Sequence, residues 1–128
     1  DQTHALRVLK TLQEAGESDP DLLTAALLHD AGKCRLSPTI WDRVVGAAGE
    51  KLFPEQAAKW STGAPTLLRR PFVIRFQHAA WGAEMAREVG SSPRAVYLIR
   101  HHQDDAAVLS DPHERRLLAR LKWADDQN

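Results

Sequence analysis

The chain has 128 residues, a length typical of one domain with one hydrophobic core, and we expect residues 1–128 to form a single domain. Hydrophobic residues make up 43% and charged residues 27% of the chain, the balance of a soluble globular protein. The formal net charge is zero, which excludes an overall field that would attract nucleic acid or an anionic membrane.

No apolar stretch approaches the roughly 20 residues that a membrane-spanning helix needs, and the N-terminus lacks the pattern of a secretion signal. The single cysteine, Cys34, has no internal disulfide partner, which suits a reducing compartment. We therefore expect a cytoplasmic protein with neither a membrane nor a nucleic acid as partner. The oligomeric state is left open.

Apolar residues repeat at helical spacing from the start of the chain. The first stripe ends near Gly16 and consists of Leu6, Val8, Leu9 and Leu12. Asp19-Pro20 is a helix-start signal, with an N-cap residue followed by proline at the first helical position. It predicts a buried helix through Leu28, which Gly32 ends.

The middle of the chain is less regular. Ser37-Pro38 repeats the start signal and predicts a helix that stops near Gly46 or Gly49. From Glu50 to Arg70 the helical pattern is weaker, and we expect only short helical pieces around Pro54 and Pro65.

Three further helices follow. We expect them at Phe72–Val89, closed by Gly90, from Ser92-Pro93 to His102, and from Asp111-Pro112 to Asp125. No segment alternates in the manner of a strand. The sequence predicts an all-α fold, a helical bundle of five main helices with additional short helices in the middle segment.

The adjacent pair His29 and Asp30 closes the apolar run Leu22–Leu28. One imidazole nitrogen and two carboxylate oxygens at a helix end can bind metal when ligands from facing helices reach the same place. Candidate ligands on the other predicted helices are His4, His78, His101, His102 and Asp125. Imidazole and carboxylate together suit Fe, Mn, Co, Ni or Zn. The number of candidates fits two divalent ions about 3.5–4 Å apart better than one.

Four segments, in order, resemble the HD-domain superfamily (HDIG-type) of metal-dependent phosphohydrolases over nearly the whole chain. They are "LLTAALLHDAGK", "HAAWGAEMAREVG", "IRHHQ" and "LKWADD". The resemblance implies an HD-domain-like bundle in which one metal is bound by His4, His29, Asp30 and Asp125. It also implies that Asp30 bridges to a second metal, bound by His78 and by His101 or His102. Adjacent helical residues point about 100° apart, and the spacing from His78 favours His101.

The resemblance further implies hydrolysis of a phosphate ester (a phosphomonoester, nucleotide or cyclic dinucleotide) by a water that the metals activate. Asp30 and Lys33 would be catalytic, with Lys33 also binding phosphate, although a lysine here also suits a solvated helix end. The basic cluster Arg69, Arg70 and Arg75 could clamp a small phosphorylated, nucleotide-like substrate. A di-iron oxygenase of the HD-domain type and a non-catalytic sensor domain are the alternatives. Lys33 and the basic cluster favour phosphate.

Overall fold

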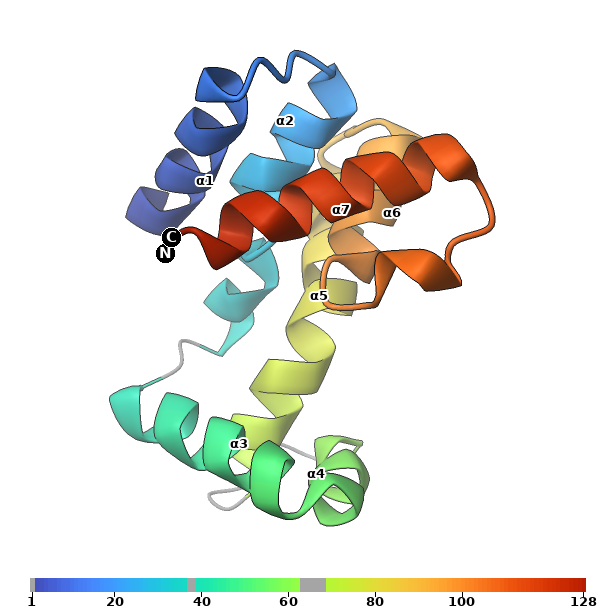
Figure 1. Cartoon of the computed structure of the whole chain (residues 1–128). Coiled ribbons are helices and arrows are strands. Elements are labelled where there is room, and N and C mark those ends of the chain that lie inside the picture. Colours follow the sequence, from blue (N-terminus) through green and yellow to red (C-terminus); the bar gives the residue numbers. More distant parts are fainter. Residues whose placement is uncertain (1, 37–38, 63–68) are drawn as a thin grey trace.

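The computed structural model describes residues 2–36, 39–62 and 69–128, which form seven α-helices, two short 3-10 helices and no strand (Figure 1). The α-helices are α1 (Gln2–Glu14), α2 (Pro20–Leu28), α3 (Ile40–Leu52), α4 (Pro54–Ser61), α5 (Arg70–Glu88), α6 (Pro93–His101) and α7 (Pro112–Asp126). The 3-10 helices are η1 (Ala31–Arg35) and η2 (Ala106–Val108). The all-α fold class is confirmed. No described helix has the length and apolar character needed to span a membrane.

Side-chain caps start three helices where the sequence predicts them. Asp19 accepts hydrogen bonds from two backbone N–H groups at the start of α2. Ser92 accepts one such bond at the start of α6 and Asp111 accepts two at the start of α7, and a proline follows each of the three caps. Each cap satisfies amide donors that the first helical turn otherwise leaves unpaired.

The hydrophobic core lies among α1, α2, α6, α7 and the C-terminal part of α5. Its largest fully buried aliphatic side chains include Val8, Leu12, Leu22, Leu98, Ile99, Leu117, Leu118 and Leu121. Each such side chain stabilises the fold by about 1.5–3 kcal/mol relative to an exposed one. Leu6, which we assigned to the first stripe, is 58% exposed, and Ala5 takes its place in the buried face of α1.

The middle segment is more regular than predicted. Thr39 and Asp42 form a capping box at the start of α3, and the helix continues through both glycines to Leu52. A Cβ on Gly46 would lie 3.4 Å from the Pro71 carbonyl oxygen, and one on Gly49 only 2.5 Å from the Phe72 ring. The predicted stop was wrong: both glycines stay helical, and the missing side chain at Gly49 allows α3 to approach α5 closely.

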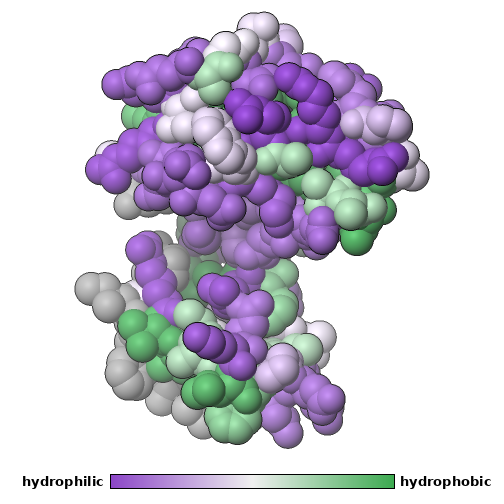
Figure 2. All heavy atoms as spheres, viewed as in Figure 1, coloured by the Kyte–Doolittle hydropathy of each residue, from purple (hydrophilic) through white to green (hydrophobic). Residues whose placement is uncertain are grey.

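The short piece around Pro54 is confirmed as α4, whereas the piece expected around Pro65 lies outside the described residues. In Figure 1, α5 runs from the bundle to an arm made of α3 and α4. The arm helices pack on each other and on α5. Figure 2 shows the surface hollowed between arm and bundle. The two chain ends lie side by side at the bundle edge (Figure 1).

Candidate metal centre

The turn that carries His29 and Asp30 lies directly on α5. α2 ends at Leu28, His29 is its C-cap residue, and η1 follows Asp30. A Cβ on Gly32 would lie 1.8 Å from the His78 carbonyl oxygen and 2.6 Å from the Gly82 amide nitrogen. Only a glycine therefore fits at position 32, and this contact brings Asp30 beside His78.

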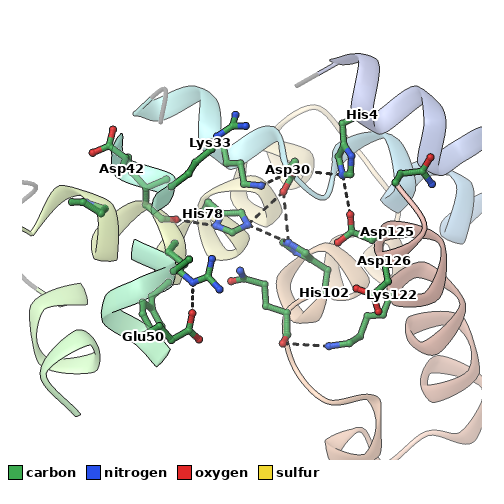
Figure 3. A pocket seen from close by; sticks show the side chains of 18 of the residues that line it. His4, Asp30, Lys33, Asp42, Glu50, His78, His102, Lys122, Asp125 and Asp126 are labelled. Atoms are coloured by element: carbon green, nitrogen blue, oxygen red, sulfur yellow. Dashed lines mark hydrogen bonds and ion pairs between the residues drawn. The ribbon is translucent and has the colours of Figure 1, made fainter. Parts of the chain in front are cut away.

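Six side chains from five segments of the chain form two adjacent groups that could each hold a metal ion, and Figure 3 labels all of them except His29. The first group consists of His4, His29 and Asp125, and the second of Asp30, His78 and His102. Within each group the potential ligand atoms lie within 4.8 Å of one another. In the first group, His4 Nε2 is 2.8 Å from Asp125 Oδ1.

The carboxylate of Asp30 faces both groups. Its Oδ1 lies 3.5 Å from His78 Nε2 and 3.9 Å from His102 Nε2. Its Oδ2 lies 3.9 Å from His4 Nε2 and 3.8 Å from His29 Nε2. One oxygen thus points to each group, which is the arrangement of a bridging carboxylate.

Three buried imidazoles are oriented by backbone carbonyls of their own helices. In each, Nδ1 is 2.7–2.9 Å from a carbonyl oxygen three or four residues earlier, the pairs being His29–Ala26, His78–Ile74 and His102–Ile99. Donation from Nδ1 leaves the lone pair on Nε2, the nitrogen that faces the candidate metal centre.

The Nε2 lone pairs of these three rings lack a hydrogen-bond donor in the described part of the chain and are suited to a cation. His29 Nε2 is buried without a hydrogen-bond partner among the described residues. The Nε2 atoms of His78 and His102 are 3.2 Å apart, so two acceptors face each other. Buried polar atoms are normally paired, and a divalent metal would satisfy all three nitrogens. The donor set therefore fits a metal.

Burial and neighbouring charges shift the pKa values of these groups in different directions. Burial is the main influence on His102 and lowers its pKa to about 4, which keeps the ring neutral. Burial acts to raise the pKa of Asp30, but His78, His29 and Lys33 outweigh it and hold that pKa well below the usual range.

Burial likewise acts to lower the pKa of His29, but Asp125 and Asp30 outweigh it and raise that pKa. His29 in turn lowers the pKa of Asp125. At 3.5 Å, the contact between His29 Nε2 and Asp125 Oδ1 acts as an electrostatic pair, since the geometry of a hydrogen bond is not met.

His101 points away from both groups, contrary to the preference drawn from its spacing. Its Nδ1 is 2.6 Å from Asp104 Oδ2, and its ring contacts that of Tyr97 in a tilted arrangement with centroids 4.4 Å apart. His102, at the C-cap of α6, faces Asp30 and His78 instead. Because the two side chains diverge around the helix axis, only His102 reaches the centre.

A cavity of about 1000 Å³ lies between arm and bundle, beside both groups (Figure 3). Lys33 lines it and donates from Nζ to Asp30 Oδ2 at 2.7 Å. Of the predicted arginine cluster, only Arg75 lines the cavity, where it pairs with Glu50. Arg70 does not line the cavity and lies 3.3 Å from Asp42. Arg69 is exposed and does not line the cavity either.

Other cations also line this cavity, namely Arg7, Arg43 and Lys122, of which Arg7 and Lys122 were not predicted from the sequence. Two of them stand at a spacing that could have revealed them. Arg7 comes three residues after His4, and Lys122 three residues before Asp125. Residues three apart share one face of a helix.

Comparison with known proteins agrees with this geometry. Residues 2–125 match the family model described as HD domain. Searches among curated proteins and solved structures returned no match. A family match over nearly the whole chain, together with helices that bring the paired His and Asp residues to one place, places this chain in the HD-domain superfamily of metal-dependent phosphohydrolases.

Proposed function

We propose that this protein is a metal-dependent phosphohydrolase that cleaves a phosphate ester at a centre of two divalent ions. One ion would be held by His4, His29, Asp125 and Asp30 Oδ2. The other would be held by His78, His102 and Asp30 Oδ1. The orientation of Asp30, with one oxygen toward each group, carries this proposal. Nitrogen and oxygen ligands of this kind suit Fe, Mn, Co, Ni or Zn.

Two such ions would supply positive charge to phosphoryl oxygens and lower the pKa of a water. The chain itself fixes the ligands, because the backbone carbonyls orient the three buried rings. Lys33 lies beside Asp30 at the cavity edge, where its ammonium group can bind a phosphoryl oxygen or donate a proton to the leaving oxygen. Lys33 and Asp30 are thus the catalytic residues we propose.

The cations of the cavity wall favour phosphate over the oxygenase alternative, because all but one of the six carboxylates that also line the cavity are candidate metal ligands or are already paired. Arg7, Lys33, Arg43 and Lys122 face the cavity in addition to the ion-paired Arg75. Such cations suit an anionic substrate, and arginine in particular binds phosphate through two parallel hydrogen bonds. The substrate we expect is therefore a small phosphorylated, nucleotide-like molecule.

Metal analysis combined with a substrate screen tests the proposal. Protein purified without chelator should contain close to two ions per chain and should hydrolyse at least one phosphomonoester or phosphodiester. Asp30→Asn should lose both ions and the activity, because one carboxylate serves both groups. Asp126→Asn is the matched control, since Asp126 lines the cavity but belongs to neither group.

Two results would contradict the proposal. Unchanged metal content in Asp30→Asn would overturn the bridging role. A mixed-valent iron signal in the electron paramagnetic resonance spectrum that responds to a non-phosphorylated substrate, without phosphatase activity, would support the oxygenase instead.

A further inference from the structure

The cavity extends well beyond the six candidate ligands. α5 runs along it from His78 at the metal end to Pro71, seven residues earlier, about 10 Å along a helix axis. α3 forms the opposite end of the cavity and faces it with Arg43, Ala47 and Glu50, which share one face of the helix. A substrate can therefore contact the arm as well as the metals.

Most charged groups of the cavity are already paired. Lys33 binds Asp30, Arg75 pairs with Glu50, and Lys122 donates to backbone carbonyls at 2.6 and 3.4 Å. Arg7 and Arg43 differ, because the guanidinium group of neither has an ion-pair or hydrogen-bond partner within the described part of the chain. A guanidinium group that faces a cavity without a partner is available to a ligand.

The two arginines occupy different positions relative to the centre. Arg7 follows the candidate ligand His4 by three residues on the same face of α1, so it lies on the bundle side of the cavity. Arg43 lies on α3, in the arm, where no residue belongs to either metal group. A phosphate at the metals would therefore lie on the same side of the cavity as Arg7, whereas Arg43 reaches the cavity from the arm.

Apolar groups line the same cavity. They are Ala47 on α3 and Pro71, Ile74 and Phe76 on α5, and Phe76 is 40% exposed. These side chains suit the organic body of a ligand. The volume of about 1000 Å³ is at the upper end of cavities that bind drug-sized ligands and far exceeds what a phosphate ion alone requires.

Resting on the proposed function, we propose that Arg43 is a specificity-determining residue that binds a second anionic group of the substrate. The substrate class is then a phosphate ester whose leaving group carries a further phosphate or a carboxylate. The scissile phosphate lies at the metals, the organic body lies on the apolar wall, and the second anion lies at Arg43. Both anions accept the two parallel hydrogen bonds that a guanidinium offers.

Three matched probes test this proposal on the manganese-loaded protein. Phenyl phosphate has one anionic group, para-carboxyphenyl phosphate adds a carboxylate, and para-phenylene bisphosphate adds a second phosphate. Hydrolysis is followed by phosphate release, and binding is followed by calorimetry. The two-anion probes should be preferred, and the better of the two identifies the second group.

Arg43→Gln should lower kcat/KM for the preferred two-anion probe by about tenfold or more, mainly through KM, as loss of a charge-assisted hydrogen bond predicts. The value for phenyl phosphate should change by less than about twofold, because that probe does not reach Arg43. Arg43→Lys should restore part of the loss. Arg100→Gln is the matched control, an exposed arginine on α6 outside the cavity.

The readouts separate the two proposals. Wild-type binding that prefers two-anion probes, with the preference lost in Arg43→Gln, supports the role of Arg43 even when no probe is hydrolysed. In that case the hydrolase proposal alone fails. Hydrolysis with equal preference for all three probes, or an equal loss for all three in Arg43→Gln, overturns the role of Arg43 and leaves the hydrolase proposal standing.

Discussion

The buried histidines of the candidate centre are fixed before any metal binds. His29, His78 and His102 each use Nδ1 to bind a carbonyl of the preceding helical turn. Rings held in this way lose little orientational freedom when a metal binds, and partners that orient a ligand are worth about 10- to 100-fold in metal affinity. The ligand geometry is therefore a property of the helices.

The neighbouring pair His101 and His102 provides a matched test of the ligand assignment. His102→Ala should lose one of two ions, with affinity for that ion lower by about 100-fold or more, because Nε2 faces His78 and Asp30. His101→Ala should retain both, since its ring binds Asp104 and Tyr97. Metal content and manganese titration of the two variants check this. Equal metal loss in both would contradict the assignment.

Acid should release the two ions at different pH values. The pKa of His29 is raised above 6.5, so protons compete with metal for its Nε2 in mild acid. The pKa of His102 is lowered to about 4, so protons compete there only in stronger acid. As the pH falls from about 7.5 to about 5, the ion bound at His29 should leave first.

Single-site variants measure this order. His102→Ala keeps the first group intact, and His29→Ala keeps the second. The metal content of each, measured after equilibration at a series of pH values, should show the earlier loss in His102→Ala. The same midpoint in both variants, or the reverse order, would disprove the expected difference between His29 and His102.

At the scale of elements, local signals predicted most helix starts and ends but placed the end of α3 too early. Asp19, Ser92 and Asp111 cap helices through atoms a few residues away, so the sequence around each suffices. Gly46 and Gly49 look like stop signals, yet α3 continues because Pro71 and Phe72 of α5 pack against them. That contact is distant in sequence and leaves no local pattern.

The contact between η1 and α5 is the most demanding in the fold, and Gly32→Ala tests it. The new methyl group would overlap the His78 carbonyl oxygen at 1.8 Å, a backbone atom that cannot rotate away. We expect a loss of about 3 kcal/mol in unfolding free energy, the upper end of typical overpacking, together with weaker metal binding. Thermal unfolding and metal content measure the two effects.

Gly46→Ala is the control for this substitution. Its Cβ would meet the nearest atom at 3.4 Å, an ordinary contact, and alanine favours a helix over glycine. This variant should keep both stability and metal. A Gly32→Ala protein as stable as Gly46→Ala would show that η1 can shift away from α5.

At the scale of the whole molecule, the core lies in the bundle and the arm rests on one helix. The main cluster of buried apolar residues includes none from α3 or α4. Backbone amides of the arm should therefore exchange hydrogen faster than those of α1, α2, α6 and α7. Exchange measured by mass spectrometry checks this. Equal protection in arm and bundle would contradict it.

The sequence predicted most of the candidate metal ligands but only some of the charged residues that line the cavity beside them. His4, His29, Asp30, His78 and Asp125 come together as the ordered segments indicated. The choice between His101 and His102 depends on how α6 is rotated against α5, which the sequence does not contain. Whether Arg43 faces the cavity depends in the same way on where α3 packs, and the neighbouring pair Arg69 and Arg70 was a poor guide to the wall.

His4 and Asp125 are separated by 121 positions in the sequence, yet their side chains touch. An ion in the first group would consequently link two segments that are 121 positions apart, α1 and α7. Closing so long a loop removes much entropy from the unfolded chain, so loading this group should strengthen the fold as a cross-link does. Replacing either His4 or Asp125 would break this link while leaving the second group whole.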